Sequence, residues 1–289
     1  MKISVCTLLF KHRSIEDAIR LSSEIGFDGV EIWGQEGHIS ANTSIKKAKS
    51  IKSVLDYYGQ EVPCIASYIA DFSTKSDDEC QESIVEFEKY MNLMDIIGCN
   101  MIRLWPGGPN AFLAQDYHFE RAAYWVAKCS DLALQYRKRI ALEIHNGSLI
   151  ESVESADRFM KLLNRENVGL IHDAANMYIT DTDYKLRSVS ILGGKIFHVH
   201  VKDELRIQDD TLPGAFHDIT VHGDEIFQQK RLGEGAVDHV PLLKGLIRIG
   251  YDGFLSCECH APGLDIENAK HELKKIRELI EFCSREKLK

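Results

Sequence analysis

The sequence contains no CxxC pair, although eight cysteines occur among its 289 residues. A structural zinc site built from four cysteines needs such pairs, so their absence argues against one. Most of the cysteines lie in apolar segments, where buried thiols are usually found, and we therefore expect a reduced, cytoplasmic protein without structural disulfides. No apolar run is long enough to span a membrane, and the first residues lack a signal-peptide cleavage site.

The sequence also has no cluster of lysine and arginine, and its formal net charge is −9. An acidic chain without a basic stripe argues against a nucleic-acid partner. We therefore expect neither a nucleic-acid nor a membrane partner, and a small molecule as the substrate. The sequence does not decide between a single chain, a homo-oligomer and a complex with a partner subunit.

Short apolar segments alternate with longer amphipathic segments along the whole chain. Strands are predicted at 2–8, 28–33, 61–67, 100–105, 139–145, 167–173, 195–202 and 253–259. Helices are predicted between and after them, at 14–25, 44–59, 78–97, 118–137, 153–164, 182–192, 238–249 and 266–286. Eight β-then-α units without a break in composition predict an α/β fold, a single-domain (β/α)8 TIM barrel over residues 1–289. The alternative is an open, doubly wound sheet, and the absence of a GxGxxG motif after the first strand weakens its dinucleotide-binding version.

One connection is much longer than the others, a loop insertion at about 204–238 between the seventh strand and its helix. It contains Pro213, Gly214, Gly223 and Gly233. A loop of this length in a compact domain is usually functional or mobile, and the alternative is a simple surface excursion.

The predicted strand 195–202 has polar side chains on one face. Successive residues of a strand point to opposite faces, so His198, His200 and Lys202 share one face, while Phe197 and two valines share the other. Burying polar groups without partners is costly, so we expect the polar face to have acidic neighbours. We expect Lys202 to contact the substrate or a nearby carboxylate, and the alternative is an ion pair with Asp203 or Glu31.

Catalytic groups of (β/α)8 barrels lie at the C-terminal ends of the strands. Glu143, Asp173 and Glu258 occupy equivalent places near the ends of three strands, and His200 lies on a fourth. Three confined carboxylates repel one another, and a divalent cation removes that penalty. Oxygen ligands with one imidazole suit Mn²⁺, Mg²⁺ or Co²⁺, and Zn²⁺ stays an alternative. The simpler interpretation is four unrelated surface groups.

Further inward-facing residues are predicted near the same strand ends. Arg103 needs an acidic partner, and we expect a structural ion pair with Glu31 or Glu143. We expect Glu31 to support a ligand rather than to be a fifth ligand. Trp33 and Trp105 are candidate walls for a substrate such as a sugar, whose C–H face packs on aromatic rings, and packing under the loops is the alternative.

Six motifs together resemble those of the sugar phosphate isomerase/epimerase family, the xylose isomerase-like barrels related to endonuclease IV. The motifs are GFDGVEIWG (26–34), ALEIHNG (141–147), NVGLIHDAAN (167–176), HVHVKD (198–203), LGEGAVD (232–238) and GYDGFLSCE (250–258). Each motif is weak by itself, but their order and spacing are typical of this superfamily. The resemblance implies metal ligands at Glu143, Asp173, His200 and Glu258, the same four residues.

The resemblance to the sugar epimerases also implies roles in catalysis. There the two glutamates, here Glu143 and Glu258, act as acid and base on opposite faces of the substrate and move a proton next to a metal-bound carbonyl through an enediolate. Arg206 stands where these epimerases keep an arginine near the substrate hydroxyls. The cation would polarise the carbonyl and stabilise the developing oxyanion.

The sequence departs from the epimerase pattern at two positions. Asn176 stands where many members have a histidine, and we expect it to contact the substrate. The Glu-x-His pattern at 143–145 resembles a branch that includes lyases, such as 3-dehydroshikimate dehydratase-like proteins. In that branch His145 is a candidate general base, because imidazole suits proton abstraction near neutral pH, and the alternative is a structural role or support of a metal ligand.

The sequence thus predicts an enzyme that is a divalent-metal-dependent isomerase or epimerase of a small, non-phosphorylated sugar or polyol ketone, with Mn²⁺ as the expected metal. The alternative is a metal-dependent lyase that eliminates a β-substituent with His145 as base. Two further interpretations have less support, namely an endonuclease IV-like hydrolase, which needs more histidine ligands and a basic groove, and a non-catalytic sugar-binding barrel.

Overall fold

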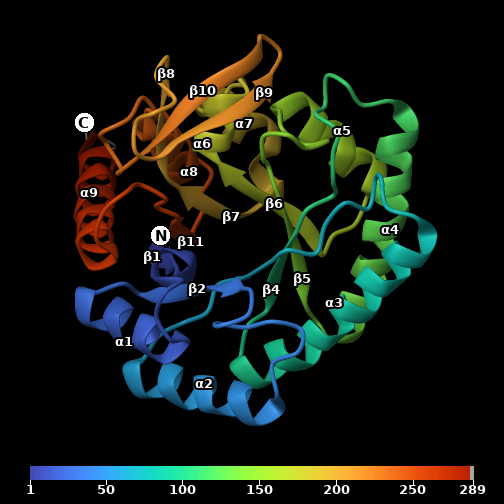
Figure 1. Cartoon of the computed structure of the whole chain (residues 1–289), viewed down its shortest axis with the longest axis horizontal. Coiled ribbons are helices and arrows are strands. Elements are labelled where there is room, and N and C mark those ends of the chain that lie inside the picture. The colour runs from blue at the N-terminus through green and yellow to red at the C-terminus, as the bar shows by residue number, and fades with distance from the viewer. Residues whose placement is uncertain (287–289) are drawn as a thin grey trace.

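The computed structural model describes residues 1–286, and its central feature is a closed barrel of eight parallel strands inside a ring of helices (Figure 1). The barrel strands in chain order are β1 (Lys2–Cys6), β2 (Gly29–Gly34), β3 (Ile65–Ser67), β4 (Met101–Leu104), β5 (Arg139–Glu143), β6 (Val168–Asp173), β7 (Ile196–Val201) and β11 (Phe254–Cys257). Strand β11 pairs with β1 and closes the barrel. The predicted single-domain (β/α)8 barrel is confirmed.

The helices follow the strands nearly where the sequence predicts them. They are α1 (Ile15–Ile25), α2 (Ile45–Tyr58), α3 (Asp77–Ile97), α4 (Asp116–Gln135), α5 (Val153–Leu163), α6 (Ala174–Ile179), α7 (Leu186–Leu192), α8 (His239–Arg248) and α9 (Asp265–Glu286), with short 3₁₀ turns η1 (Thr7–Phe10) and η2 (Gly193–Lys195). Helix α6 is an addition to the prediction. Among residues 1–286, no helix combines the length and the apolar composition that crossing a membrane requires.

Local signals fix the helix ends. Ser14 caps α1, since its Oγ accepts a hydrogen bond from the backbone N–H of Asp17 at 3.1 Å. The same helix ends at Gly26, whose φ of +106° is a left-handed conformation that glycine adopts without strain. Between these ends, Ile15 and Ile19 are fully buried against the barrel. Burying each such side chain contributes about 1.5–3 kcal/mol to folding.

The cysteines support the prediction of a protein without structural disulfides. All eight are buried, and no disulfide joins any two of them within residues 1–286.

The alternation predicted for β7 is wrong at Phe197. The pairing of β6 with β7 shifts register between Leu170 and Ile171, so Phe197 is a bulged residue without a partner. Its ring therefore points into the barrel, where an added Cβ at Gly169 would lie 2.2 Å from Phe197 Cγ. There it packs in a small apolar cluster with Ala141 and Ile171, which lie two positions before Glu143 and Asp173 on the same strand faces. An apolar plug thus fills the barrel below the polar strand ends.

The segment 204–238 is an insertion as predicted, but most of it is a sheet rather than an irregular loop. Strands β8 (Asp203–Ile207), β9 (Ala215–Thr220) and β10 (Gly223–Lys230) form an antiparallel sheet with β10 in the middle. Figure 1 shows it at the top of the molecule, next to α6. The buried ring of Phe227 holds it there, because it meets the rings of Phe216 and Tyr178 at 5.9 and 6.4 Å.

Candidate metal centre and active site

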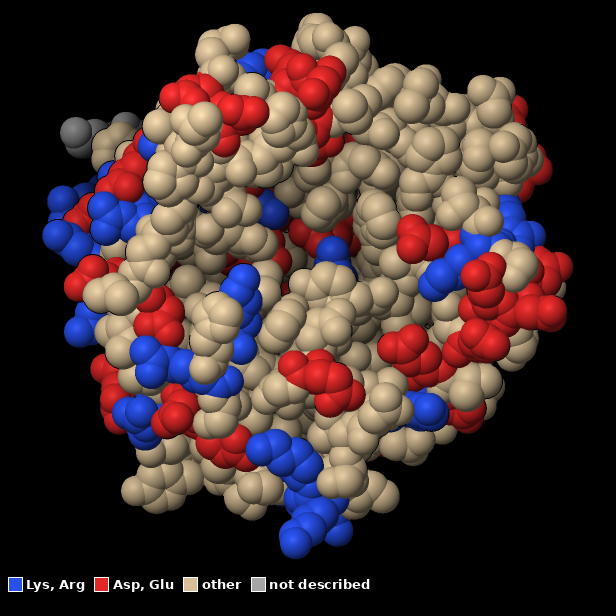
Figure 2. Space-filling view, in the orientation of Figure 1, with Lys and Arg blue, Asp and Glu red and all other residues tan. Residues whose placement is uncertain are grey.

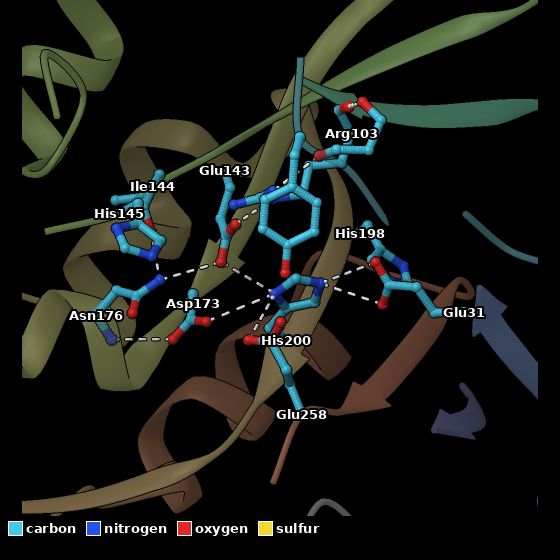
Figure 3. Close-up of polar contacts among 12 residues, drawn as sticks. Glu31, Arg103, Glu143, Ile144, His145, Asp173, Asn176, His198, His200 and Glu258 are labelled. Atoms are coloured by element: carbon cyan, nitrogen blue, oxygen red, sulfur yellow. Dashed lines mark hydrogen bonds and ion pairs between the residues drawn. The ribbon is translucent and has the colours of Figure 1, made fainter. Parts of the chain in front are cut away.

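Four side chains from four strand ends meet around one imidazole nitrogen. Nδ1 of His200 lies 3.2 Å from Oε1 of Glu143, 3.6 Å from Oδ2 of Asp173 and 3.5 Å from Oε2 of Glu258. Figure 3 shows these groups pointing toward one another. One potential ligand atom from each residue lies within 4.8 Å of the others. We call Glu143, Asp173, His200 and Glu258 the quartet, and the structure brings these four sequence-predicted residues together.

The quartet lies at the bottom of an open depression. Glu143, Asp173 and His200 are almost completely buried, and the side chain of Glu258 is 13% exposed. Figure 2 shows a hollow near the centre of the face seen in Figure 1, with acidic and basic side chains in its depth. A small polar molecule can therefore reach the quartet from one side, while the apolar plug closes the other.

The donor atoms of the quartet fit a divalent cation. Oδ2 of Asp173 is buried, and its polar neighbours are the ammonium of Lys202 at 3.1 Å and Nδ1 of His200 at 3.6 Å, so it lies where positive charge is already needed and where a cation fits. Nε2 of His200 lies 3.1 Å from both carboxylate oxygens of Glu31. The surrounding carboxylates raise the pKa of His200, so without a metal its imidazolium offsets their charge. When a cation replaces the proton on Nδ1, the proton on Nε2 still donates to Glu31 and the lone pair of Nδ1 binds the metal. Three carboxylates and one imidazole thus support binding of a divalent metal, as predicted.

Positive groups surround the carboxylates of the quartet. The guanidinium of Arg103 donates to Oε2 of Glu143, which is the structural ion pair predicted for it. Burial would raise the pKa of Glu143, but the charges of Arg103 and His200 hold it well below its ordinary value. Burial likewise opposes ionisation of Glu258, and Lys202 and His200 hold its pKa low. Both carboxylates are therefore ionised at neutral pH.

Lys202 lies at the quartet itself. Its Nζ is 3.1 Å from Oδ2 of Asp173 and 3.1 Å from Oε2 of Glu258. The sequence predicted contact with a substrate or a carboxylate, and the structure provides two carboxylates from the quartet. The alternative ion pairs with Asp203 and Glu31 are not formed among the described residues.

Asn176 lies behind the quartet rather than in front of it. It is 2% exposed, and its Nδ2 donates to Oε1 of Glu143 at 3.1 Å and to the carbonyl oxygen of Ile144 at 3.2 Å. Its backbone N–H donates to Oδ1 of Asp173 at 2.9 Å. Asn176 therefore orients two carboxylates, and its contact with substrate stays a prediction.

Arg206 contacts two acids of the protein. Its guanidinium lies 2.7 Å from Oδ2 of Asp181 and 3.1 Å from Oε1 of Glu225, and it stacks over the ring of Phe227 at 5.2 Å. These contacts join the inserted sheet to the segment after α6. The role of Arg206 near substrate hydroxyls stays a prediction.

His145 is beside the quartet and has one ring nitrogen free of the backbone. Nδ1 lies 2.7 Å from the carbonyl oxygen of Asn146, so it carries the proton and leaves the lone pair on Nε2. The ring of Trp105 packs against His145 with 5.9 Å between centroids. Trp33 instead donates from Nε1 to the hydroxyl of Tyr68 at 2.9 Å. Trp105 is thus the tryptophan next to the candidate base.

Comparison with known protein families shows which family this barrel belongs to. The model of the xylose isomerase-like TIM barrel family matches residues 19–285. The chain belongs to this family. The resemblance found in the sequence is therefore confirmed, and the match covers every strand of the barrel except β1.

This xylose isomerase-like barrel is similar to several named enzymes. An inosose isomerase of Bacillus velezensis is 22% identical over 276 residues, which cover 94% of this chain and 92% of that protein. A 3-dehydroshikimate dehydratase of Bacillus anthracis is 23% identical over 205 residues, which cover 70% of this chain and 72% of that protein. These relatives are named as enzymes, which confirms the prediction of an enzyme.

The fold is close to that of a zinc-containing structure. The crystal structure of the IOLI protein with a bound zinc atom has a TM-score of 0.80 at 19% sequence identity, and the match covers 97% of this chain and 98% of that chain. At 19% sequence identity, the similarity between the two structures shows a shared fold only.

Two acidic residues that the sequence reasoning missed come from the inserted sheet of this xylose isomerase-like barrel. Asp218 on β9 accepts a hydrogen bond from Nδ2 of Asn146, next to His145. Glu204 on β8 is buried between Lys202 and the sheet. Extending the alternation His198, His200, Lys202 by one step would have indicated Glu204, whereas no local signal marks Asp218.

Proposed function

We propose that this chain is a divalent-metal-dependent enzyme that removes a proton next to the carbonyl group of a small polyol ketone. The observation that carries the proposal is the quartet around Nδ1 of His200 with the free Nε2 of His145 beside it. The named relatives, dehydratases and an isomerase, support this class of reaction.

The quartet Glu143, Asp173, His200 and Glu258 would hold the metal, with Mn²⁺ as our first choice and Zn²⁺, Co²⁺ or Mg²⁺ as alternatives. The bound cation would polarise the substrate carbonyl and stabilise negative charge on its oxygen. The zinc of the IOLI protein supports a metal on this fold.

Protein groups supply the acid–base chemistry. His145 takes the proton from the carbon next to the carbonyl, because its Nδ1–H is fixed on the carbonyl oxygen of Asn146 and its Nε2 is the basic atom. Trp105 limits the movement of the ring and forms an apolar wall for the substrate. When a metal binds the carboxylates of Asp173 and Glu258, Lys202 is released from them and contacts substrate hydroxyls. Trp33 forms a second apolar wall of the substrate site, farther from His145 than Trp105.

The geometry favours a lyase, and specifically a dehydratase, over the isomerase that the sequence favours. An epimerase mechanism with two glutamates needs both carboxylates free to exchange protons with the substrate. Glu143 is held by Arg103, Asn176 and His200, so its oxygens are engaged. Elimination needs only one base, and His145 is that base.

An isomerase remains the second candidate because of one observation. Oε1 of Glu143 and Oε2 of Glu258 lie 3.2 and 3.5 Å from the same nitrogen, Nδ1 of His200, so the two glutamates of that mechanism meet at one point.

Proton NMR in D₂O tests the proposal and separates the two outcomes. The Mn²⁺- or Zn²⁺-reconstituted protein is incubated with inososes, 3-dehydroshikimate and ketohexoses. Solvent deuterium at the carbon next to the carbonyl is expected for one of these classes, with loss of water in a dehydratase and an epimer or isomer in an isomerase. The absence of exchange with every substrate class and each of the four metals would contradict the proposal.

A further inference from the structure

The inserted sheet carries an acidic side chain over the metal centre. Inward-facing His198, His200 and Lys202 alternate along β7 and the residue after it, and Glu204 on β8 is the next position in the same alternation. The intervening Asp203 points the other way, where its carboxylate accepts hydrogen bonds from the backbone N–H groups of residues 233, 235 and 237 at 2.8–3.0 Å. This anchor fixes the start of β8, and the carboxyl group of Glu204 lies within electrostatic reach of Lys202, Asp173 and Glu258 at the metal centre.

Glu204 is buried and has an unused oxygen. Glu204 is 4% exposed, and its Oε2 atom is shielded from solvent and has no hydrogen-bond partner in the protein. Buried carboxyl oxygens are nearly always hydrogen-bonded, because leaving one unpaired is costly. A ligand hydroxyl in the depression would satisfy this atom, so the orphaned oxygen points to a substrate contact.

The charges around Glu204 favour its neutral form. Burial, with smaller contributions from the charges of Asp173, Asp218 and Glu258, raises the pKa of Glu204 to about 8 against the opposing charge of Lys202. These groups come from β6, from β9, from the end of β11 and from the end of β7. A carboxylic acid that keeps its proton at neutral pH can donate a hydrogen bond or the proton itself.

We propose that Glu204 is a further catalytic residue, whose carboxylic acid contacts the hydroxyl group that leaves the substrate and protonates its oxygen. This inference rests on the proposed dehydratase function. The C–H bond next to the carbonyl breaks as His145 takes the proton, and the electron pair stays as the enolate of the carbonyl. This pair forms the new C=C bond as the C–O bond at the neighbouring carbon breaks, the proton of Glu204 moves to the departing oxygen, and one water leaves. Solvent returns a proton to Glu204 and receives the proton of His145.

Separate assays of the two half-steps in Glu204→Gln test this role. Glutamine keeps the size and hydrogen-bonding ability of the side chain but donates no proton. We expect Glu204→Gln to retain one metal ion per chain and to exchange the substrate α-proton into D₂O at a rate near wild type. Its dehydration rate should fall by about 100-fold or more. Glu204→Met should lose dehydration as well, and Asp224→Asn, on the exposed surface of β10, is the matched control for the sheet.

A second readout needs no substrate. An acid whose pKa is raised in the folded state destabilises folding increasingly as pH rises from about 4.5 to about 8, so Glu204→Gln should flatten this part of the stability profile of the metal-free protein. Wild-type dehydration by Glu204→Gln would overturn the inference, and so would loss of metal or of α-proton exchange in that variant. If the wild type itself exchanges no α-proton, the proposed function fails, and this inference fails with it.

Discussion

Nζ of Lys202 lies 3.1 Å from Oδ2 of Asp173, the same oxygen that lies 3.6 Å from Nδ1 of His200. The ammonium group therefore contacts an atom that a metal ion in the quartet would bind. Burial opposes the charge of Lys202, but Asp173 and Glu258 raise its pKa well above the ordinary value, so the ammonium stays charged. Lys202 and a cation compete for the same negative charge.

Replacing Lys202 by methionine should make the metal-free protein depend on metal for stability. Breaking a buried ion pair leaves uncompensated carboxylates and costs about 3–5 kcal/mol. Lys202→Met should unfold at lower urea concentration than wild type without metal and gain more stability from added Mn²⁺. The control is Lys49→Met on the exposed face of α2. Equal free energies of unfolding for Lys202→Met and wild type without metal would show that the ion pairs of Lys202 with Asp173 and Glu258 do not stabilise the fold.

Glu31 should strengthen metal binding through His200. Its carboxylate accepts from Nε2 of His200 and lies 3.1 Å from Nε2 of His198, so it fixes the orientation of the proposed ligand. Loss of such a partner lowers metal affinity by about 10–100-fold. Competition with a fluorescent chelator at constant pH measures this loss in Glu31→Gln, with Glu36→Gln as the exposed control. An unchanged affinity would remove Glu31 from the metal site.

His145 should affect rate and not metal content. The side chain contacts the carbonyl oxygen of Asn146 and the ring of Trp105 but is no member of the quartet. His145→Ala should keep one metal per chain and lose about 10²–10⁴-fold in turnover, the usual contribution of a general base. His217→Ala, on exposed β9, serves as the histidine control. A fully active His145→Ala enzyme would refute the role as base.

A buried acid far from the quartet should make stability depend on pH. Burial raises the pKa of Glu272 on α9 to about 7, although its Oε1 accepts from the backbone N–H of Leu232 at 2.9 Å. Glu272 therefore stays protonated to a higher pH in the folded state than in the unfolded state. As a result, it destabilises the fold increasingly from about pH 4.5 to about pH 7, and by a constant amount above pH 7. Below this window the effect is absent.

Urea unfolding of Glu272→Gln measures this effect. The variant should be more stable than wild type by about 3 kcal/mol at pH 8 and nearly equal to it at pH 4.5. Glu278→Gln, on the exposed side of the same helix, should show no such pH dependence. A constant difference between Glu272→Gln and wild type at both pH values would contradict the assignment.

The barrel and the convergence of the quartet could be predicted from the sequence because both follow from periodicity. Eight repeats of an apolar strand and an amphipathic helix specify the barrel, and a closed parallel barrel places equivalent strand ends next to one another. Glu143 and Asp173, two such ends on neighbouring strands, therefore had to face one centre with His200.

Other features depend on contacts that no local pattern contains. Phe197 turns inward because β6 and β7 shift register where Gly169 leaves room for the ring. Arg206 and Asn176 are polar residues near the site, but their roles depend on which distant groups they meet, and both meet protein acids or carbonyls. The inserted sheet escaped prediction because its strands are largely polar and separated by turn residues.

Metal analysis of the purified and reconstituted protein tests the central claim most directly. Mass spectrometry of the wild type after Mn²⁺ or Zn²⁺ loading and gel filtration should find one ion per chain. Glu143→Gln and Glu258→Gln should retain far less than one, while Glu36→Gln retains one. A wild type without bound metal, or quartet variants that keep one ion per chain, would contradict a metal centre built from Glu143, Asp173, His200 and Glu258.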